Sequence, residues 1–460
     1  MCFLFTNTVL QETTIAKTNR STSTWPERAA IASQQYRDAF KVGSQQFSNA
    51  EMARERAAFT RWKAIENLDK YLIEFEANFI KSGGKVIWAQ DITDALSAIQ
   101  EILKKSANKL VLKSKTSMAD EIGLKGGLLN DGYRTLETDT GDYIADASGD
   151  HSGHMILPAI HKSLEEIGEL LKKDMVLSHK ADANEIVAKI RQKLRGEFLK
   201  AGTGITGCNF LVADPGAIVL TENEGNAQLT ASLPKTHIVL AGIEKILPSM
   251  NDLDLFLPLI STYGTGQEIT TYNTIITGPK QGEELDGPEE LYVILLDNGR
   301  SDVLSHEIQR QAMTCIKCGA CQFSCPVYLS AGGNEFSSPL TAVTLPLQSS
   351  NLEAQEQAIK YSTLCGSSRD VCPVKIDFPR LLLQNRKLFV DKGFHPRSEK
   401  LFYFFWKKAM MKRDIMNWKG IKAGKYIMES LNKSRSGLRE MPTVVPKSFN
   451  EQWREKMNFK

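Results

Sequence analysis

The stretch that decides how the C-terminal half of this sequence folds is Cys315–Pro326, which reads CIKCGACQFSCP. Its spacing, Cys-x-x-Cys-x-x-Cys-x-x-x-Cys-Pro, is that of the ligand runs of bacterial ferredoxins. The two-residue gaps let three thiolates from one tightly turned loop reach three irons of a cubane. Zinc ribbons use paired CxxC knuckles instead, and disulfides need an oxidising compartment. The run therefore predicts an iron–sulfur site.

A partial second run follows forty residues later and reads Cys365-x-x-Ser368-x-x-x-Cys372-Pro373. When its Cys-Pro is aligned with that of the first run, Ser368 falls on a ligand position. A serine oxygen is a harder and more basic ligand than a thiolate, so it is a weaker partner for iron–sulfur chemistry. The two runs therefore supply six thiolates, whereas two [4Fe–4S] cubanes take four cysteines each.

In two-cluster proteins the cysteine before proline ligates the other cluster, and this crossing predicts how the thiolates are shared. The expected ligands of one complete [4Fe–4S] cluster are Cys315, Cys318, Cys321 and Cys372. Cys325 and Cys365 remain for a second cluster, with Ser368 and Ser362 as weak oxygen candidates. We expect this second cluster to be labile, incomplete or absent.

Length and composition place the sequence among ordinary globular chains. It has 460 residues, 42% hydrophobic and 24% charged, which is enough for two or three domains. A net charge of +3 implies no nucleic-acid partner. No apolar run approaches eighteen residues, so no transmembrane helix is expected. The first residues lack the basic region and the cleavage site of a signal peptide, and thiolate ligands need reducing conditions. Together these features predict a cytoplasmic protein. Cys2 and Cys208 are expected to be free thiols.

The C-terminal end differs in charge from the rest. Between Asp391 and Lys460 the sequence has 17 Lys or Arg against 7 Asp or Glu, interleaved with the aromatic run Phe402–Trp406. One interpretation is an element that docks on a partner or peripherally on an anionic membrane surface. The other is a solvated helix that covers the cluster domain.

Hydrophobic patterns divide the chain into four parts. These are a partly helical N-terminal extension (1–60), an α/β domain (61–300), a mainly α-helical ferredoxin domain (301–390) and the basic, aromatic tail (391–460). Helical periodicity runs from Glu27 to Lys81 and stops at Ser82-Gly83-Gly84. Strands are expected at 85–88, 109–112, 133–137, 209–213, 217–221, 236–240 and 292–296. Because they alternate with helices, they predict a mainly parallel sheet covered on both faces.

Several blocks of the α/β region resemble a known domain when they are taken together and in order. The longest is Gly204–Thr230, GITGCNFLVADPGAIVLTENEGNAQLT, which resembles the signature of the LUD domain. Other blocks that resemble this domain are Leu110–Leu124, Leu136–Ile144, Leu157–Lys162, Gly287–Glu290 and Leu296–Arg300. With the two cysteine runs and Pro373–Asp377 (PVKID), residues 60–390 resemble the lactate-utilization protein B family.

This resemblance implies an α/β fold shared with CoA transferases and ribose-5-phosphate isomerase. It also implies a place in a multi-protein system that oxidises L-lactate to pyruvate, beside a cysteine-rich subunit and a second LUD protein. The chain would be a component of an L-lactate dehydrogenase complex. Ser368 departs from the family pattern, which has a cysteine there.

Outside the cysteine runs, three side chains are weak candidates for chemistry. Lys113 and Lys115 follow a strand and precede a helix, where anions bind in α/β sheets, or they are solvated lysines at a capped helix start. Glu222 ends another strand and is a candidate base, or else a solvated turn residue. His154 and His161 are either substrate-orienting or structural histidines.

A nicotinamide cofactor is not expected from this sequence. Gly202–Gly207 has glycines at the spacing of a dinucleotide fingerprint, but it precedes a strand instead of opening a helix. We interpret it as a tight turn, with or without an anion beside it.

Two functions remain open at this point. The first is an iron–sulfur electron-transfer subunit of a lactate-oxidising complex that passes electrons to a downstream acceptor. The second is a non-redox LUD binding or regulatory protein whose clusters are structural or degraded.

Overall fold

The computed structural model describes residues 25–149, 154–178, 181–332, 338–348, 356–394, 397–411, 447 and 449–457. The chain divides into two compact units, one that ends at Lys387 and one that begins at Leu388. The first unit holds an α/β part and all six cysteines of the two runs.

A six-stranded parallel sheet lies at the centre of the first unit, with the strand order β1-β10-β7-β4-β2-β3. Its strands are β1 (Lys85–Ala89), β2 (Leu110–Lys113), β3 (Arg134–Glu137), β4 (Thr203–Thr206), β7 (Thr236–Gly242) and β10 (Glu290–Leu296). Runs such as Val293-Ile294 form the central strands because apolar side chains fill a sheet that is covered on both faces. The mainly parallel α/β sheet expected from the sequence is confirmed.

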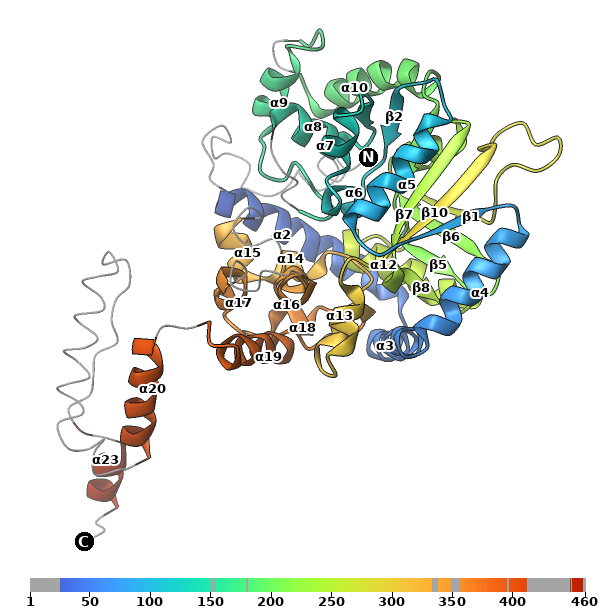
Figure 1. Cartoon of the computed structure of the whole chain (residues 1–460). Coiled ribbons are helices and arrows are strands. Elements are labelled where there is room, and N and C mark those ends of the chain that lie inside the picture. The colour runs from blue at the N-terminus through green and yellow to red at the C-terminus, as the bar shows by residue number, and fades with distance from the viewer. Residues whose placement is uncertain are drawn as a thin grey trace. The chain divides into compact units, whose positions relative to one another are not determined.

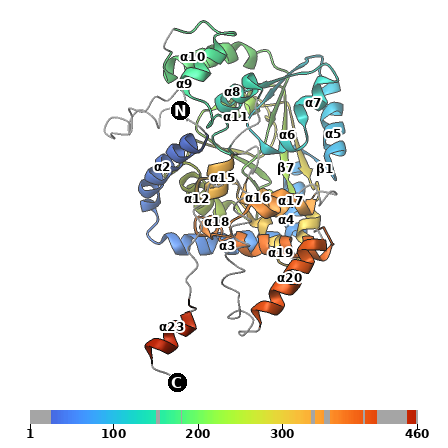
Figure 2. The same cartoon turned by 90° about the vertical axis from the view of Figure 1, so that its left-hand side faces the viewer.

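Helices cover both faces of this sheet because successive residues of each strand point to opposite sides. Ile294 packs toward one face, whose helices are α5 (Ile92–Lys104), α6 (Ser117–Glu121) and α7 (Leu124–Leu129). Val293 packs toward the other face, against α4 (Leu68–Lys81). On that same face Leu112 of β2 meets α8 (Thr140–Ser148), α9 (Leu164–Leu171) and α10 (Ala183–Phe198). Figures 1 and 2 show α9 and α10 grouped at one end of the unit and α5 beside α7.

A second, four-stranded sheet corrects one expectation from the sequence. Its order is β8-β5-β6-β9, and its strands are β5 (Phe210–Val212), β6 (Ala217–Glu222), β8 (Ile246–Leu247) and β9 (Tyr272–Ile276). The strands expected at 209–213 and 217–221 thus leave the main sheet and pair with each other antiparallel. Gly216, with φ of 65°, lies in the turn between these two strands. Because a connection this short can join only antiparallel neighbours, the two strands pair antiparallel.

The glycine-rich stretch Gly202–Gly207 is a strand in the structure, so its interpretation as a tight turn was wrong. Its residues Thr203–Thr206 form β4, which pairs with β2 and β7 in the middle of the sheet. A Cβ on Gly204 would lie 1.9 Å from the carbonyl oxygen of Thr230 in α11 (Asn226–Ser232). The glycine is therefore required for the close approach of that helix to the strand.

The N-terminal helices follow the expected helical pattern, with two interruptions. They are α2 (Trp25–Gly43), the 3-10 turn η2 (Ser44–Gln46), α3 (Ala50–Glu66) and α4. Asn49 caps α3 by accepting a hydrogen bond from the backbone N–H of Met52. The helical stretch ends at Lys81, before Gly83, as expected.

The cysteine region of the first unit is built from short helices in its described residues. They are α13 (Arg300–Ser305), η5 (Gln309–Thr314), α14 (Ala320–Ser324), α15 (Pro326–Ala331), α16 (Pro339–Gln348), α17 (Glu356–Tyr361), α18 (Ser367–Asp370) and the part of α19 (Phe378–Asp391) up to Lys387. This region shares one apolar core with α12 (Leu253–Thr265) and with the inner face of the second sheet, including Val219. It is therefore packed on the α/β part and not tethered to it by a linker.

The second unit contributes two further helices among its described residues, α20 (Arg397–Met410) and α23 (Phe449–Lys456). The aromatic run Phe402–Trp406 lies in α20, and each of its side chains is about half exposed. Among the described residues, no helix has both the length and the apolar character that a membrane crossing requires. Residues 412–446 of the basic tail lie outside the described part.

Arg61 of α3 connects the two parts of the first unit. Its side chain is 1% exposed. It donates hydrogen bonds to the carbonyl oxygens of Met313 and Thr314, both at 3.1 Å, just before the first cysteine run. It also donates to the carbonyl oxygens of Glu244, in the 3-10 turn after β7, and of Ile246, in β8. Four backbone acceptors from two distant segments are thus satisfied by one guanidinium group.

We expect Arg61→Met to lower the free energy of unfolding by about 3 kcal/mol, because it leaves buried carbonyl groups without donors. The measurement is a urea unfolding curve under anaerobic conditions. The matched control is Arg56→Met on the exposed side of the same helix, for which we expect a change within about 0.5 kcal/mol. Equal effects of the two substitutions would contradict the role assigned to Arg61.

Candidate iron–sulfur site

The first cysteine run forms a loop with two sharp turns. Lys317 and Gly319 both adopt left-handed backbone conformations, with φ of 58° and 79°. Gly319 also precedes α14, so Cys321 lies in the first turn of that helix while Cys315 and Cys318 lie in the loop. Such turns let cysteines three residues apart face a common centre.

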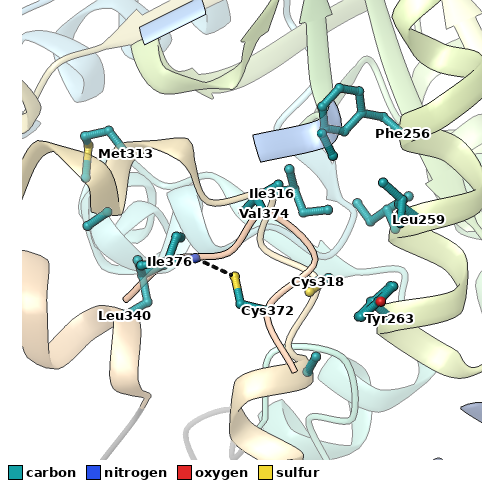
Figure 3. Close-up of a cluster of buried hydrophobic side chains, with 14 of the residues drawn as sticks. Phe256, Leu259, Tyr263, Met313, Ile316, Cys318, Leu340, Cys372, Val374 and Ile376 are labelled. Atoms are coloured by element: carbon teal, nitrogen blue, oxygen red, sulfur yellow. Dashed lines mark hydrogen bonds between the residues drawn. The ribbon is translucent and has the colours of Figure 1, made fainter. Parts of the chain in front are cut away.

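Cys372 joins this loop from the second run. It directly follows Val371, the residue that caps the C-terminus of α18, and its Sγ accepts a hydrogen bond from the backbone N–H of Ile376 at 3.4 Å. Cys315 Sγ accepts a similar bond from the N–H of Lys317 at 3.3 Å. Figure 3 shows Cys372 and Cys318 among apolar side chains of the shared core. N–H donors and apolar surroundings are the means by which proteins stabilise and tune cluster thiolates.

The electrostatics show that four of the cysteines lie close together. Burial raises the pKa of Cys318 and Cys321 far above the ordinary thiol value, and the neighbouring Cys315 raises both further. Burial and then Cys315 raise the pKa of Cys372 to about 12. Cys372 in turn contributes to the shifts of Cys318 and Cys321. Four thiols that oppose one another's ionisation need a cationic centre to become thiolates, as iron provides.

The remaining two cysteines of the runs lie at a different place. Cys325 and Cys365 both line one partly open pocket. The hydroxyl groups that line the same pocket belong to Ser362, Thr363 and Ser368. Cys365 is exposed, and its hydrogen bond with the Ser367 hydroxyl lowers its pKa. The structure therefore places Ser368 with the second pair of cysteines and not with the first four.

The donor sets of the two places differ in how well they suit a cluster. The first offers four buried or half-buried thiols, one for each iron of a cubane, and this fits a [4Fe–4S] cluster. The second offers two thiols and three hydroxyl groups, a harder set that fits such a cluster less well. Within the described residues, no three His, Cys, Asp or Glu side chains are grouped closely enough for one metal ion.

Two arginines of α3 that the sequence analysis missed support the first four cysteines. Arg54 donates to the carbonyl oxygen of Cys372 at 2.9 Å and to that of Asp370 at 2.8 Å. Arg61 holds Thr314, the residue before Cys315, in the same way. A signal was present in the sequence, because Arg61 follows Ala57 and precedes Ala64 and Ile65 on one helical stripe. An arginine on an otherwise apolar stripe indicates buried hydrogen bonding.

The lysine and glutamate candidates of the α/β part have distinct surroundings. Lys113, at the end of β2, is 3% exposed and forms an ion pair of 2.8 Å with Glu137. The Nζ of Lys115 is buried and has no hydrogen-bond partner in the described part of the chain. Glu222 accepts hydrogen bonds from the N–H groups of Ala227 and Gln228, at 2.8 and 2.7 Å, and so caps the start of α11. These hydrogen bonds are those of a helix cap, and the role of Glu222 as a base stays a prediction.

The two histidine candidates both lie against the cysteine region or the N-terminal helix. His154 is 1% exposed, and its Nδ1 accepts hydrogen bonds from the N–H groups of Ile156 and Leu157. Its ring lies 4.2 Å, centre to centre, from that of Phe323 in α14. The carbonyl oxygen of His161 accepts a hydrogen bond from Arg28 of α2.

Comparisons with known proteins agree with this geometry. The LUD domain matches residues 72–296, and the 4Fe-4S dicluster domain matches residues 311–376. The chain is thus an iron–sulfur protein in which a LUD domain precedes the cluster-binding region.

Curated relatives define the family more narrowly. The chain is 39% identical over 383 residues to proteins named lactate utilization protein B from Bacillus cytotoxicus, Bacillus thuringiensis and Bacillus cereus, covering 81% of this chain and 80% of theirs. The chain belongs to the lactate utilization protein B family. Among solved structures, a DUF162 family protein from Deinococcus radiodurans is 14% identical, with a TM-score of 0.29, and the match covers 50% of this chain and 98% of that one.

We expect Cys318→Ser to abolish most of the brown visible absorbance of the anaerobically purified protein, because a buried ligand of the first cluster is lost. Iron and sulfide analysis provides the measurement. The control is Cys208→Ser, which changes a cysteine outside both runs and should leave the iron content unaltered. Full iron retention in the Cys318 variant would show that this cysteine is not a ligand.

Ser368 allows a second measurement of cluster content. With two thiols in the second pocket, the unaltered protein should hold about four irons, or a second cluster that is lost in air, and Ser368→Cys should raise iron and sulfide toward about eight each. A second reducible EPR signal should accompany this gain. Ser368→Ala is the control, since it changes nothing if the hydroxyl is not a ligand. A stable content of about eight irons in the unaltered protein would contradict the incomplete second site.

Proposed function

We propose that this chain is the iron–sulfur electron-transfer subunit of a complex that oxidises L-lactate to pyruvate. The names of its relatives support the lactate substrate. The observation that carries the electron-transfer role is the convergence of Cys315, Cys318, Cys321 and Cys372 in a core shared with the LUD domain. A purely structural cluster would not need to lie against the domain that could bind a substrate.

The chain's own residues prepare the first site for a cluster that carries one electron at a time. Arg54 and Arg61 hold the two cysteine segments together through backbone carbonyl groups. The N–H groups of Lys317 and Ile376 donate to sulfur, which favours the thiolate form. Burial of Cys318 and Cys372 excludes water from the ligands.

Oxidation of L-lactate to pyruvate releases two electrons and two protons. One-electron carriers must therefore remove the electrons in single steps, or receive them through another cofactor. This requirement is consistent with a multi-subunit assembly, and we propose that a cysteine-rich subunit and a second LUD protein are the partners. In this arrangement residues 61–300 are the LUD domain, residues 301–390 a helical ferredoxin domain, and residues 391–460 a separate basic tail.

A second candidate function is a non-redox LUD binding or regulatory protein with structural clusters. The observation that favours it is the second pocket, where Ser362 and Ser368 stand beside Cys325 and Cys365. If this pocket held no cluster, electron transfer from one cluster to a second would be interrupted.

The proposal is tested by adding L-lactate to the anaerobic complex of this chain with the two partner proteins. We expect reversible loss of visible absorbance and an EPR signal from a reduced cluster. D-lactate measures the stereochemical preference, and a complex that contains the Cys318→Ser chain controls for absorbance from the partners. Reduction of the cluster by dithionite but not by L-lactate would favour the non-redox alternative.

A further inference from the structure

The carboxyl end of β2 places two lysines in contrasting electrostatic situations. Lys113 is neutralised by Glu137 at 2.8 Å, with Asp120 at 3.8 Å. Lys115, two residues on, has its Nζ buried, and no acceptor in the described residues lies within hydrogen-bonding distance of it. Burying an ammonium group without acceptors costs several kcal/mol, so such a group in a folded protein indicates a missing anion or water.

The carboxylate of Asp142 lies near Lys115 without a hydrogen bond to it. The charge of Lys115 opposes the rise that burial causes in the pKa of Asp142, which remains at about 6. Asp142 lies in the first turn of α8, whose cap is Asp139. Lys115 and Asp142 therefore belong to one cluster of charges, yet the described chain leaves the ammonium group open to a further acceptor.

The same place lies beside the first cysteine loop. Burial, followed by the charge of Lys115, lowers the pKa of His154 to about 3, so Lys115 and His154 are electrostatic neighbours. The ring of His154 packs on Phe323, which lies between Cys321 and Cys325. A Cβ built on Gly319 would lie 3.5 Å from Cε1 of His154. His154 thus contacts the loop that carries Cys318 and Cys321 and also senses the charge of Lys115.

The charges around Lys115 select the kind of anion. A single ammonium group neutralises one negative charge, because Lys113 is already paired with Glu137. The carboxylate of Asp142 repels a second negative charge, which disfavours phosphate groups. A small monocarboxylate satisfies both conditions.

We propose that Lys115 is the binding residue for the carboxylate of a small 2-hydroxy or 2-oxo acid, held at the carboxyl end of β2 next to the first cysteine loop. The choice of a hydroxy or oxo acid rests on the function proposed above. The anion site itself rests on the unpaired ammonium group. Carboxyl ends of parallel strands are where ligands bind in open α/β sheets.

The test uses anaerobic calorimetric titration of the full-length, cluster-loaded protein with L-lactate, with pyruvate and with inorganic phosphate. We expect L-lactate or pyruvate to bind and Lys115→Met to weaken that binding roughly ten- to a hundredfold, the range of a lost hydrogen bond to a charged group. Lys115→Arg should retain part of the affinity. The matched control is Lys200→Met, at an exposed lysine, which should bind as the unaltered protein does.

Thermal unfolding provides a second readout that does not depend on affinity. Without ligand, Lys115→Met should unfold at a higher temperature than the unaltered protein, because an unpaired buried charge has been removed. Pyruvate should raise the unfolding temperature of the unaltered protein and not that of the Met variant. Iron content should be the same in both.

Three outcomes would overturn the proposal: no binding of either acid to the unaltered protein, equal binding by Lys115→Met, or tighter binding of phosphate than of either acid. None of them decides whether L-lactate reduces the cluster in the complex, which is measured separately. Conversely, pyruvate binding through Lys115 together with an unreduced cluster would support this site and contradict the electron-transfer role.

Discussion

The hydrogen bonds of one buried guanidinium group hold the functional parts of this protein together. Arg61 binds the backbone just before the first cysteine run and the backbone just after β7, so the cluster loop and the α/β sheet are positioned against each other. These bonds are made inside the molecule, where competing water is absent and each unmet carbonyl is costly. Arg54, two turns earlier on the same helix, adds the second cysteine segment through Cys372. A single helix of the N-terminal part thus connects three segments that are far apart in the sequence.

Buried charges in the α/β part differ in whether the protein itself neutralises them. Burial alone would raise the pKa of Glu244, but the guanidinium of Arg300, 2.6 Å away, outweighs it and holds the pKa at about 2. Arg300 is also bound by Glu121 at 2.9 Å, so this network is complete without a ligand. Lys115 lacks such a partner among the described residues. A complete ionic network stabilises a fold, whereas an incomplete one marks a place where a ligand of opposite charge gains binding energy.

The two cysteine sites are unequal for reasons of chemistry and of burial. The first site joins four thiols inside the shared apolar core, where Cys318 and Cys372 are nearly inaccessible to water. At the second site Cys325 is also buried in this core but Cys365 is exposed, and hydroxyl groups, that of Ser368 among them, line the same pocket. Soft thiolates in an apolar environment resist hydrolysis of the cluster, and hard oxygen donors in contact with water do not. The donors and surroundings of the first site therefore suit a [4Fe–4S] cluster better than those of the second.

Local spacing in the sequence determined the chemistry of the cluster region and the parallel strands. The gaps within Cys315–Pro326 and the β-branched run before Leu296 depend on residues only a few positions apart, and geometry over such distances is nearly the same in any fold. Only the tertiary structure decided that the strands within 209–221 form a second sheet. It also decided that Arg61 donates hydrogen bonds to four carbonyl groups, and that Glu137 pairs with Lys113 and not with Lys115. These outcomes depend on which distant segments meet, and that is settled by the packing of whole layers against one another, which no short stretch of sequence contains.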